Sequence, residues 1–140
     1  MRVALLILDG DRWQREALAT ALACEGCHAE HTGDSATALR LLTQRHFQLV
    51  LIDPAAPTTG GWRIIEQLIL LYPNLPMIVL TSPGESARPT GLTGVSCRFS
   101  KPIDFTALLG IIEGMLWPSV KPSLSTAVSG SKPIPALQTS

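Results

Sequence analysis

The chain has 140 residues, 46% of them hydrophobic, and its 11 basic and 11 acidic side chains give a formal net charge of zero. This length supports one domain with a full core plus a tail, and the balanced charge gives no sign of a nucleic-acid-binding surface. The first apolar run, VALLIL, is too short for a signal peptide or a membrane span and leads directly into Asp9. We therefore expect a cytoplasmic protein that does not associate with a membrane.

Short apolar runs alternate with segments of helical periodicity along the chain. The predicted strands cover residues 3–8, 27–31, 48–53, 76–80 and 95–99, and the predicted helices cover residues 12–24, 35–45, 62–72 and 103–117. This alternation implies βαβ units with right-handed crossovers, and so an α/β fold with a doubly wound, five-stranded parallel sheet. The helix expected between the last two strands is eroded, because Pro and Gly residues interrupt residues 83–94.

The end of the first helix carries the sequence CEGCH, which admits two interpretations. It matches the C-x-x-C-H pattern of c-type haem attachment, and C-x-x-C spacing also occurs in redox and metal sites. Alternatively, Gly26 ends the helix as a left-handed cap and Cys27 opens the next strand. We favour the cap, since the chain shows no export signal and its three cysteines argue against a disulfide framework. At the start of this helix, Asp11 is the expected cap, with Gln14 completing a capping box.

The composition changes after Pro118. Residues 118–140 are rich in Pro, Ser, Thr and small side chains, and only two of them are charged. Such a segment cannot bury enough apolar surface to fold. We expect a domain at residues 1–117, followed by a flexible tail or the start of a linker at residues 118–140.

Polar side chains follow four of the predicted strands at the points where those strands end. Asp9 follows the first strand, Asp53 the third, Thr81 the fourth and Lys101 the fifth. The carboxyl ends of parallel strands meet at one edge of an open α/β sheet, where ligands bind. Acids, a hydroxyl and an ammonium group at one edge suit metal-assisted phosphoryl transfer, with one acid as nucleophile.

This set resembles the receiver domain of two-component response regulators. The most specific parts are Asp53-x-x-x-Pro57-x-x-Gly60-Gly61 and Lys101-Pro102, and the resemblance covers residues 1–117. It implies the flavodoxin-like strand order 2-1-3-4-5 and a histidine kinase or phosphotransfer protein as partner. It also implies that Asp53 is the phosphoacceptor, that the Thr81 hydroxyl bonds a phosphoryl oxygen, and that a cis Lys101–Pro102 bond aims the ammonium at Asp53.

The resemblance further implies a Mg²⁺ cofactor, held by Asp9, Asp53 and the backbone carbonyl of Ala55. The family usually has two adjacent acids after the first strand, and the second of them ligates the metal directly. Here Gly10 occupies that second place, so we expect weakened Mg²⁺ binding. Asp11 is a possible replacement ligand, although its role as a helix cap is the stronger expectation.

A second departure concerns the family's output. Three residues before the lysine, the family places a Tyr or Phe that acts as a rotameric switch; here the residue is Arg98, beside Phe99.

The last helix is apolar nearly all round, which suggests a surface for a partner or a homodimer formed by Leu109, Ile112, Leu116 and Trp117. Alternatively, the tail folds back over this helix.

Three functions are consistent with these residues. The first is a receiver that takes a phosphoryl group on Asp53, atypical in its acid pair and switch residue. The second is a pseudo-receiver that binds partners without phosphorylation. The third is a haloacid-dehalogenase-like phosphatase, suggested by Asp9, Asp11, Thr81 and Lys101. That enzyme would need a further acidic loop after the lysine and would leave the Asp53 loop unexplained, so we favour a receiver that is not an enzyme.

Overall fold

A computed structural model describes residues 3–55, 58, 60–82, 95 and 97–116 of the chain. Its elements, in chain order, are β1 (Ala4–Leu8), α1 (Arg12–Cys24), β2 (His28–Thr32), α2 (Ser35–Gln44), β3 (Leu49–Ile52), α3 (Gly61–Leu71), β4 (Met77–Thr81), β5 (Cys97–Ser100) and α4 (Phe105–Leu116). The eroded helix expected within residues 83–94 and the tail expected at residues 118–140 lie outside the described residues, so both stay predictions. None of the described helices has the length and apolar character needed to cross a bilayer.

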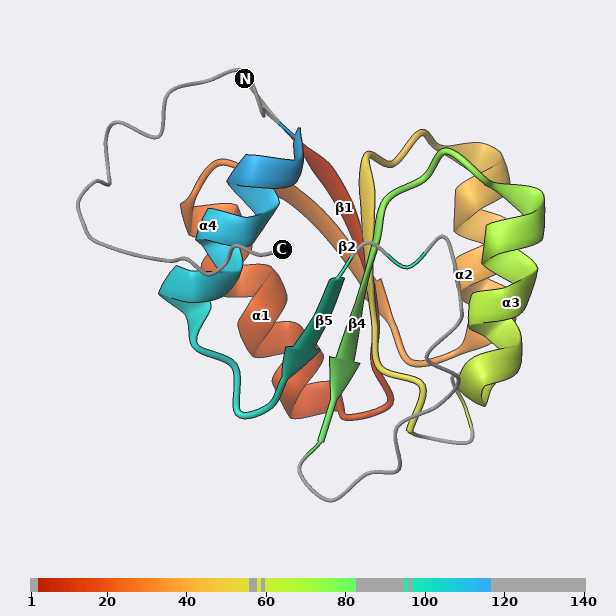
Figure 1. Cartoon of the computed structure of the whole chain (residues 1–140), viewed down its shortest axis with the longest axis horizontal. Helices are drawn as coiled ribbons and strands as arrows, with labels where there is room; N and C mark the ends of the chain where they lie inside the picture. The colour runs from red at the N-terminus through yellow and green to blue at the C-terminus, as the bar shows by residue number, and fades with distance from the viewer. Residues whose placement is uncertain (1–2, 56–57, 59, 83–94, 96, 117–140) are drawn as a thin grey trace. The chain divides into compact units, whose positions relative to one another are not determined.

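The five strands form one parallel sheet in the order β2-β1-β3-β4-β5. This confirms both the predicted fold class and the order implied by the resemblance. Figure 1 shows α1 on one face of the sheet, and α2 and α3 together on the other. The sheet and these three helices belong to a compact unit that extends to Asp104.

Both faces of the sheet are buried, which explains why its central strands are continuous apolar runs. Successive side chains of a strand point to opposite faces. On the face covered by α2 and α3, one buried cluster joins alternate strand residues to residues of the two helices: Leu6, Leu8, Val50, Ile52, Met77, Val79, Ala38, Leu42, Phe47, Ile64, Ile65 and Leu68. The intervening strand residues, Leu5, Ile7, Leu49, Leu51, Ile78 and Leu80, are fully buried as well.

Helix α1 begins and ends with capping interactions. The Asp11 carboxylate accepts hydrogen bonds from the backbone N–H groups of Trp13, at 3.0 Å, and Gln14, at 3.2 Å, as expected of an N-cap. The other half of the predicted capping box is wrong, because the Asp11 N–H donates to Asp9 Oδ1 at 2.9 Å and not to the Gln14 side chain. The start of the helix is therefore tied directly to the acid that follows β1.

At the other end of α1, Gly26 has a φ of +90° and its N–H donates to the carbonyl of Ala23 at 3.0 Å. The N–H of Cys27 donates to the carbonyl of Leu22 at 3.1 Å, which completes a Schellman motif. The cap interpretation of the CEGCH sequence is confirmed. All three cysteines are free thiols.

A left-handed turn leads from the Asp53 loop into α3. Gly60 has a φ of +88°, and a Cβ there would lie 3.3 Å from the Cβ of Ile64 and 3.4 Å from that of Ser35. Backbone conformation and crowding thus both favour glycine at this position. Helix α3 begins at Gly61, one residue before the predicted start at residue 62.

Helix α4 belongs to a second unit that begins at Phe105. Leu108 and Ile112, one turn apart, are its buried residues. The predicted partner surface therefore needs correction, because Ile112 is only 1% exposed and cannot contribute to an exposed patch. The remaining members of that surface are Leu109 and Leu116, which are partly exposed, while Trp117 lies outside the described residues.

Candidate functional site

Two carboxylates lie side by side at the carboxyl edge of the sheet. Asp9 follows β1 and Asp53 follows β3, and these neighbouring strands pair in register, with Leu8 opposite Ile52. Backbone hydrogen bonds continue past the strand ends, since the N–H of Asp53 donates to the carbonyl of Leu8 at 2.8 Å. Asp9 is 3% exposed and Asp53 is 5% exposed, and they are the buried charged residues of the described chain.

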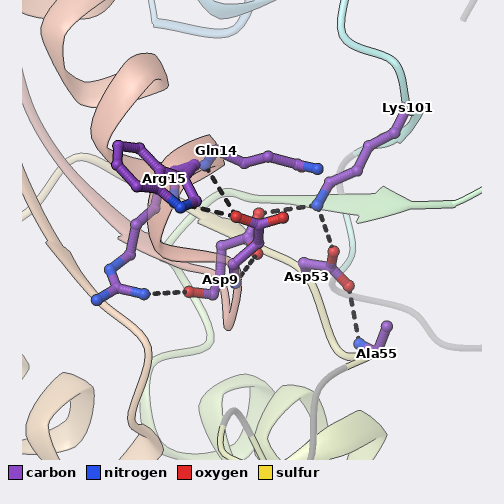
Figure 2. Close-up of polar contacts among 8 residues, drawn as sticks. Asp9, Gln14, Arg15, Asp53, Ala55 and Lys101 are labelled. Atoms are coloured by element: carbon purple, nitrogen blue, oxygen red, sulfur yellow. Dashed lines mark hydrogen bonds and ion pairs between the residues drawn. The ribbon is translucent and has the colours of Figure 1, made fainter.

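Lys101 brings a positive charge to both acids. The β4–β5 ladder extends beyond the strands, because the N–H of Lys101 donates to the carbonyl of Thr81 at 2.7 Å. The Lys101 Nζ lies 2.9 Å from Asp9 Oδ2 and 2.6 Å from Asp53 Oδ2. Figure 2 shows the Lys101 side chain reaching both acids. The bond between Lys101 and Pro102 is cis, as the resemblance implied.

The other oxygen of each carboxylate accepts a hydrogen bond from the backbone. Asp9 Oδ1 accepts from the N–H of Asp11 at 2.9 Å, and Asp53 Oδ1 accepts from the N–H of Ala55 at 2.8 Å (Figure 2). All four carboxylate oxygens therefore have an N–H donor. Buried charges are tolerated when they are paired and hydrogen-bonded in this way.

The surroundings of the Lys101 ammonium group act on its pKa in two directions. Burial lowers the pKa, because it disfavours the charged form. The hydrogen bonds to Asp53 and Asp9 and the charges of the two carboxylates act against burial and outweigh it, so that the pKa of Lys101 is raised above its ordinary value. The lysine is a stable cation at neutral pH.

The remaining predicted site residues differ in how they join this cluster. Thr81 ends β4, is partly buried, and is linked to Lys101 through its backbone carbonyl. The Asp11 carboxylate is engaged with the first turn of α1, and Ala55 contacts Asp53 through its N–H group. The roles of the Thr81 hydroxyl and the Ala55 carbonyl stay predictions.

Arg15 contacts the backbone next to the acid pair although nothing in the sequence singled it out. It lies on α1, one turn after the cap, and its Nη1 donates to the carbonyl of Asp9 at 3.2 Å (Figure 2). Gly33 provides the room for this contact, since a Cβ there would lie 2.9 Å from Arg15 Nη1 and 3.3 Å from the Asp9 carbonyl. A basic residue one turn into the helix after Asp9 was the available signal, but such residues are common on exposed helix faces.

The donors at this edge suit Mg²⁺ in kind. The carboxylates of Asp9 and Asp53 are hard oxygen donors, and they already share one cation, Lys101. Gly10 contributes no side chain. Within the described part of the chain, no group of three or more His, Cys, Asp or Glu side chains is arranged to hold a metal ion.

The Arg98 side chain, on β5, packs against Trp62 of α3. Its Cζ lies 5.3 Å from the ring centroid of Trp62, a cation–π arrangement between β5 and the first turn of α3. Trp62 in turn packs against the buried cluster of that face. The exposed Arg98 is therefore associated with a neighbouring aromatic ring.

A 2-1-3-4-5 parallel sheet with two strand-end acids and a lysine at its carboxyl edge is the architecture of a receiver-like signalling domain. The chain belongs to the response regulator receiver domain family, whose family model matches residues 5–113. It is therefore a response regulator receiver domain of two-component systems.

Curated relatives and solved structures agree with this assignment. The chain is 35% identical over 118 residues to a probable transcriptional regulator, ycf29, of Cyanophora paradoxa, covering 81% of this chain and 56% of the relative. It is 31% identical over 118 residues to the response regulator MprA of Mycobacterium sp. (strain KMS), covering 83% of this chain and 51% of the relative. The chain thus spans about half the length of these relatives.

Among solved structures, a CheY-like receiver domain from Methanospirillum hungatei superposes with a TM-score of 0.73 at 23% identity, covering 82% of this chain and 94% of that one. The response regulator TrrA of Thermotoga maritima, solved in complex with Mg²⁺ and BeF, gives a TM-score of 0.71 at 21% identity, covering 81% of this chain and 99% of that one. At these identities, the likeness shows a shared fold.

Proposed function

We propose that this chain receives a phosphoryl group on Asp53. The observation that carries the proposal is the Lys101 ammonium, which contacts the Asp53 and Asp9 carboxylates at 2.6 and 2.9 Å at the edge of the sheet. An Asp53 oxygen attacks the phosphorus of the donor, the bond between phosphorus and the donor's leaving group breaks, and an acyl phosphate forms. Lys101 is placed to neutralise negative charge on the transferring group.

Mg²⁺ would be held by Asp9, Asp53 and the Ala55 carbonyl. When bound, the metal would supply further charge neutralisation to the phosphoryl oxygens. The TrrA structure, which contains Mg²⁺ and BeF, is a relevant precedent in the same fold. The absence of an acid at position 10 makes this the weakest part of the proposed site, and we propose that its metal affinity is correspondingly low.

The proposed donor is a histidine kinase or a phosphotransfer protein, in keeping with membership of the receiver family. The related transcriptional regulators extend well beyond the region matched by this chain. Any output through a further domain or a partner is therefore not assigned to the described residues.

Intact-mass spectrometry after incubation with acetyl phosphate and Mg²⁺ tests the proposal. The wild-type chain should gain the mass of one phosphoryl group, and Asp53→Asn should gain none. Asp34→Asn is a matched control, because the Asp34 carboxylate accepts a backbone N–H hydrogen bond as that of Asp53 does, but it caps α2. No gain in the wild type at millimolar Mg²⁺, or a gain that persists in Asp53→Asn, would refute the proposal.

A phosphorylation-independent interaction module is the second candidate. Gly10 in the acid pair and Arg98 at the switch position both favour it, because each replaces a side chain that phosphorylation-dependent signalling uses. In this case the wild type and Asp53→Asn would bind a partner equally well, with or without acetyl phosphate. A haloacid-dehalogenase-like phosphatase receives no support from membership of the receiver family.

A further inference from the structure

Each of the four carboxylate oxygens of Asp9 and Asp53 at the edge of the sheet already has one hydrogen-bond donor. Two of the four carboxylate oxygens accept from backbone N–H groups, those of Asp11 and Ala55, whose positions are fixed by the start of α1 and by the turn after β3. The other two, Asp9 Oδ2 and Asp53 Oδ2, accept from one side chain, that of Lys101. The lysine is therefore the donor whose withdrawal would free carboxylate oxygens without rebuilding the backbone.

The net charge of the cluster formed by Asp9, Asp53 and Lys101 is also small. Two carboxylates and one ammonium leave a net charge of about −1, where a third carboxylate at position 10 would leave about −2. The Lys101 side chain is only 9% exposed, so water screens its attraction for the acids only weakly. A divalent cation thus meets a site that is both occupied by a cation and only weakly negative.

We propose that the Lys101 ammonium is the resident cation of this site and that a divalent metal has to compete with it for Asp9 Oδ2 and Asp53 Oδ2. In a site with a third acid, the metal and the lysine can each keep carboxylate oxygens of their own. Here Gly10 provides none, so the same two oxygens serve both cations. This inference deepens the proposed function and rests on it, because it concerns the metal affinity of the same acid pair.

Isothermal titration with Mg²⁺ alone, without any phosphodonor, tests the competition. Lys101→Met should bind Mg²⁺ at least about tenfold more tightly than the wild type, because both oxygens are released and the site becomes more negative. Gly10→Asp should also bind about tenfold more tightly or better, because it restores an acid while the lysine stays. An unchanged or weaker affinity in Lys101→Met would overturn the proposal.

Arg15→Met is the matched control for long-range charge. Arg15 carries the same charge and contacts Asp9, but only at its backbone carbonyl, so it occupies no carboxylate oxygen. Its removal should change Mg²⁺ affinity by less than about threefold. If Arg15→Met tightens binding as much as Lys101→Met does, the effect is general electrostatics, and direct competition is wrong.

A measurement on the wild type keeps the proposal open to refutation if Lys101→Met does not fold. The ¹⁵Nζ resonance of Lys101 should shift as Mg²⁺ saturates the site, since the ammonium loses its carboxylate partners. A Lys101 resonance that stays unchanged at saturating Mg²⁺ contradicts the competition. These experiments use no phosphodonor, so they can fail while Asp53 is still labelled by acetyl phosphate, and the reverse is equally possible.

Discussion

The chain segment around β5 supplies two cations, and their side chains lie in different environments. Lys101 is buried among two carboxylates at the edge of the sheet, whereas Arg98 is exposed and stacks on Trp62 at 5.3 Å. Breaking a buried ion pair leaves uncompensated charge in a poorly solvated place, but an exposed cation regains water when its partner is lost. Burial of the partners, more than the presence of a contact, decides how strongly each cation stabilises the fold.

Removal of the buried cation should give the largest loss of stability. Lys101→Met leaves Asp9 and Asp53 adjacent and without their shared partner, so the free energy of unfolding should fall by about 3 kcal/mol or more. Urea denaturation at neutral pH and without Mg²⁺ measures the change. Arg98→Met is the matched control from the same segment, and equal losses in the two variants would contradict the comparison.

The contact of Lys101 with the two acids should make the stability of the fold depend on pH in the alkaline range. Because the pKa of Lys101 is raised in the folded chain, its stabilising contribution is fully present below the pKa of an unfolded lysine, about 10.4, and is lost as pH rises through the higher folded value. The stability difference between the wild type and Lys101→Met should therefore stay constant from neutral pH to about pH 9.5 and shrink above about pH 10. A difference that grows with pH would show that the lysine is not charged in the folded site.

Loss of the helix cap next to the acid pair should have a smaller effect. Asp11→Ala removes the side-chain hydrogen bonds to the N–H groups of Trp13 and Gln14, at a cost of about 1 kcal/mol in unfolding free energy. Its Mg²⁺ affinity should match that of the wild type, because the carboxylate is engaged with α1. Thermal denaturation and metal titration of the same sample measure both quantities, and a fall in affinity would make Asp11 a metal ligand.

The exposed stack should give the smallest effect. Arg98→Ala should lower the free energy of unfolding by about 0.5–1 kcal/mol, the usual range for an exposed cation–π contact. A double-mutant cycle with Trp62→Leu isolates the contribution of the contact itself. A coupling energy near zero would mean that the ring and the guanidinium group are neighbours without a stabilising interaction.

The parts of the site that could be predicted from sequence are those fixed by chain direction. Apolar runs ending in Asp9 and Asp53 placed both acids at the same edge, because all strands of a parallel sheet run the same way. The resemblance to receivers added the strand order and the cis Lys101–Pro102 bond, and both are confirmed. The resemblance also implied the contact of the Lys101 ammonium with Asp53, whereas its contact with Asp9 was not predicted.

The missed contacts depend on how helices sit on the sheet, which local patterns do not encode. Arg15 reaches the Asp9 carbonyl beside Gly33 because α1 packs against β2, and the Arg98 guanidinium on β5 lies over the ring of Trp62 in the first turn of α3. The incorrect prediction that Ile112 is exposed has a related cause. An almost uniformly apolar helix gives little indication of which side is buried.

Gly33, in the turn after the edge strand β2, lies against the backbone of Asp9, one of the two acids of the site. A methyl group at this position would meet the Arg15 guanidinium, which can withdraw, and the backbone carbonyl of Asp9, which cannot move without its side chain. Gly33→Ala would therefore shift the position of Asp9 by steric contact, while Asp9, Asp53 and Lys101 all stay in the chain. A single methyl group in the turn after β2 would thus act on the acid pair from a position that carries no charge.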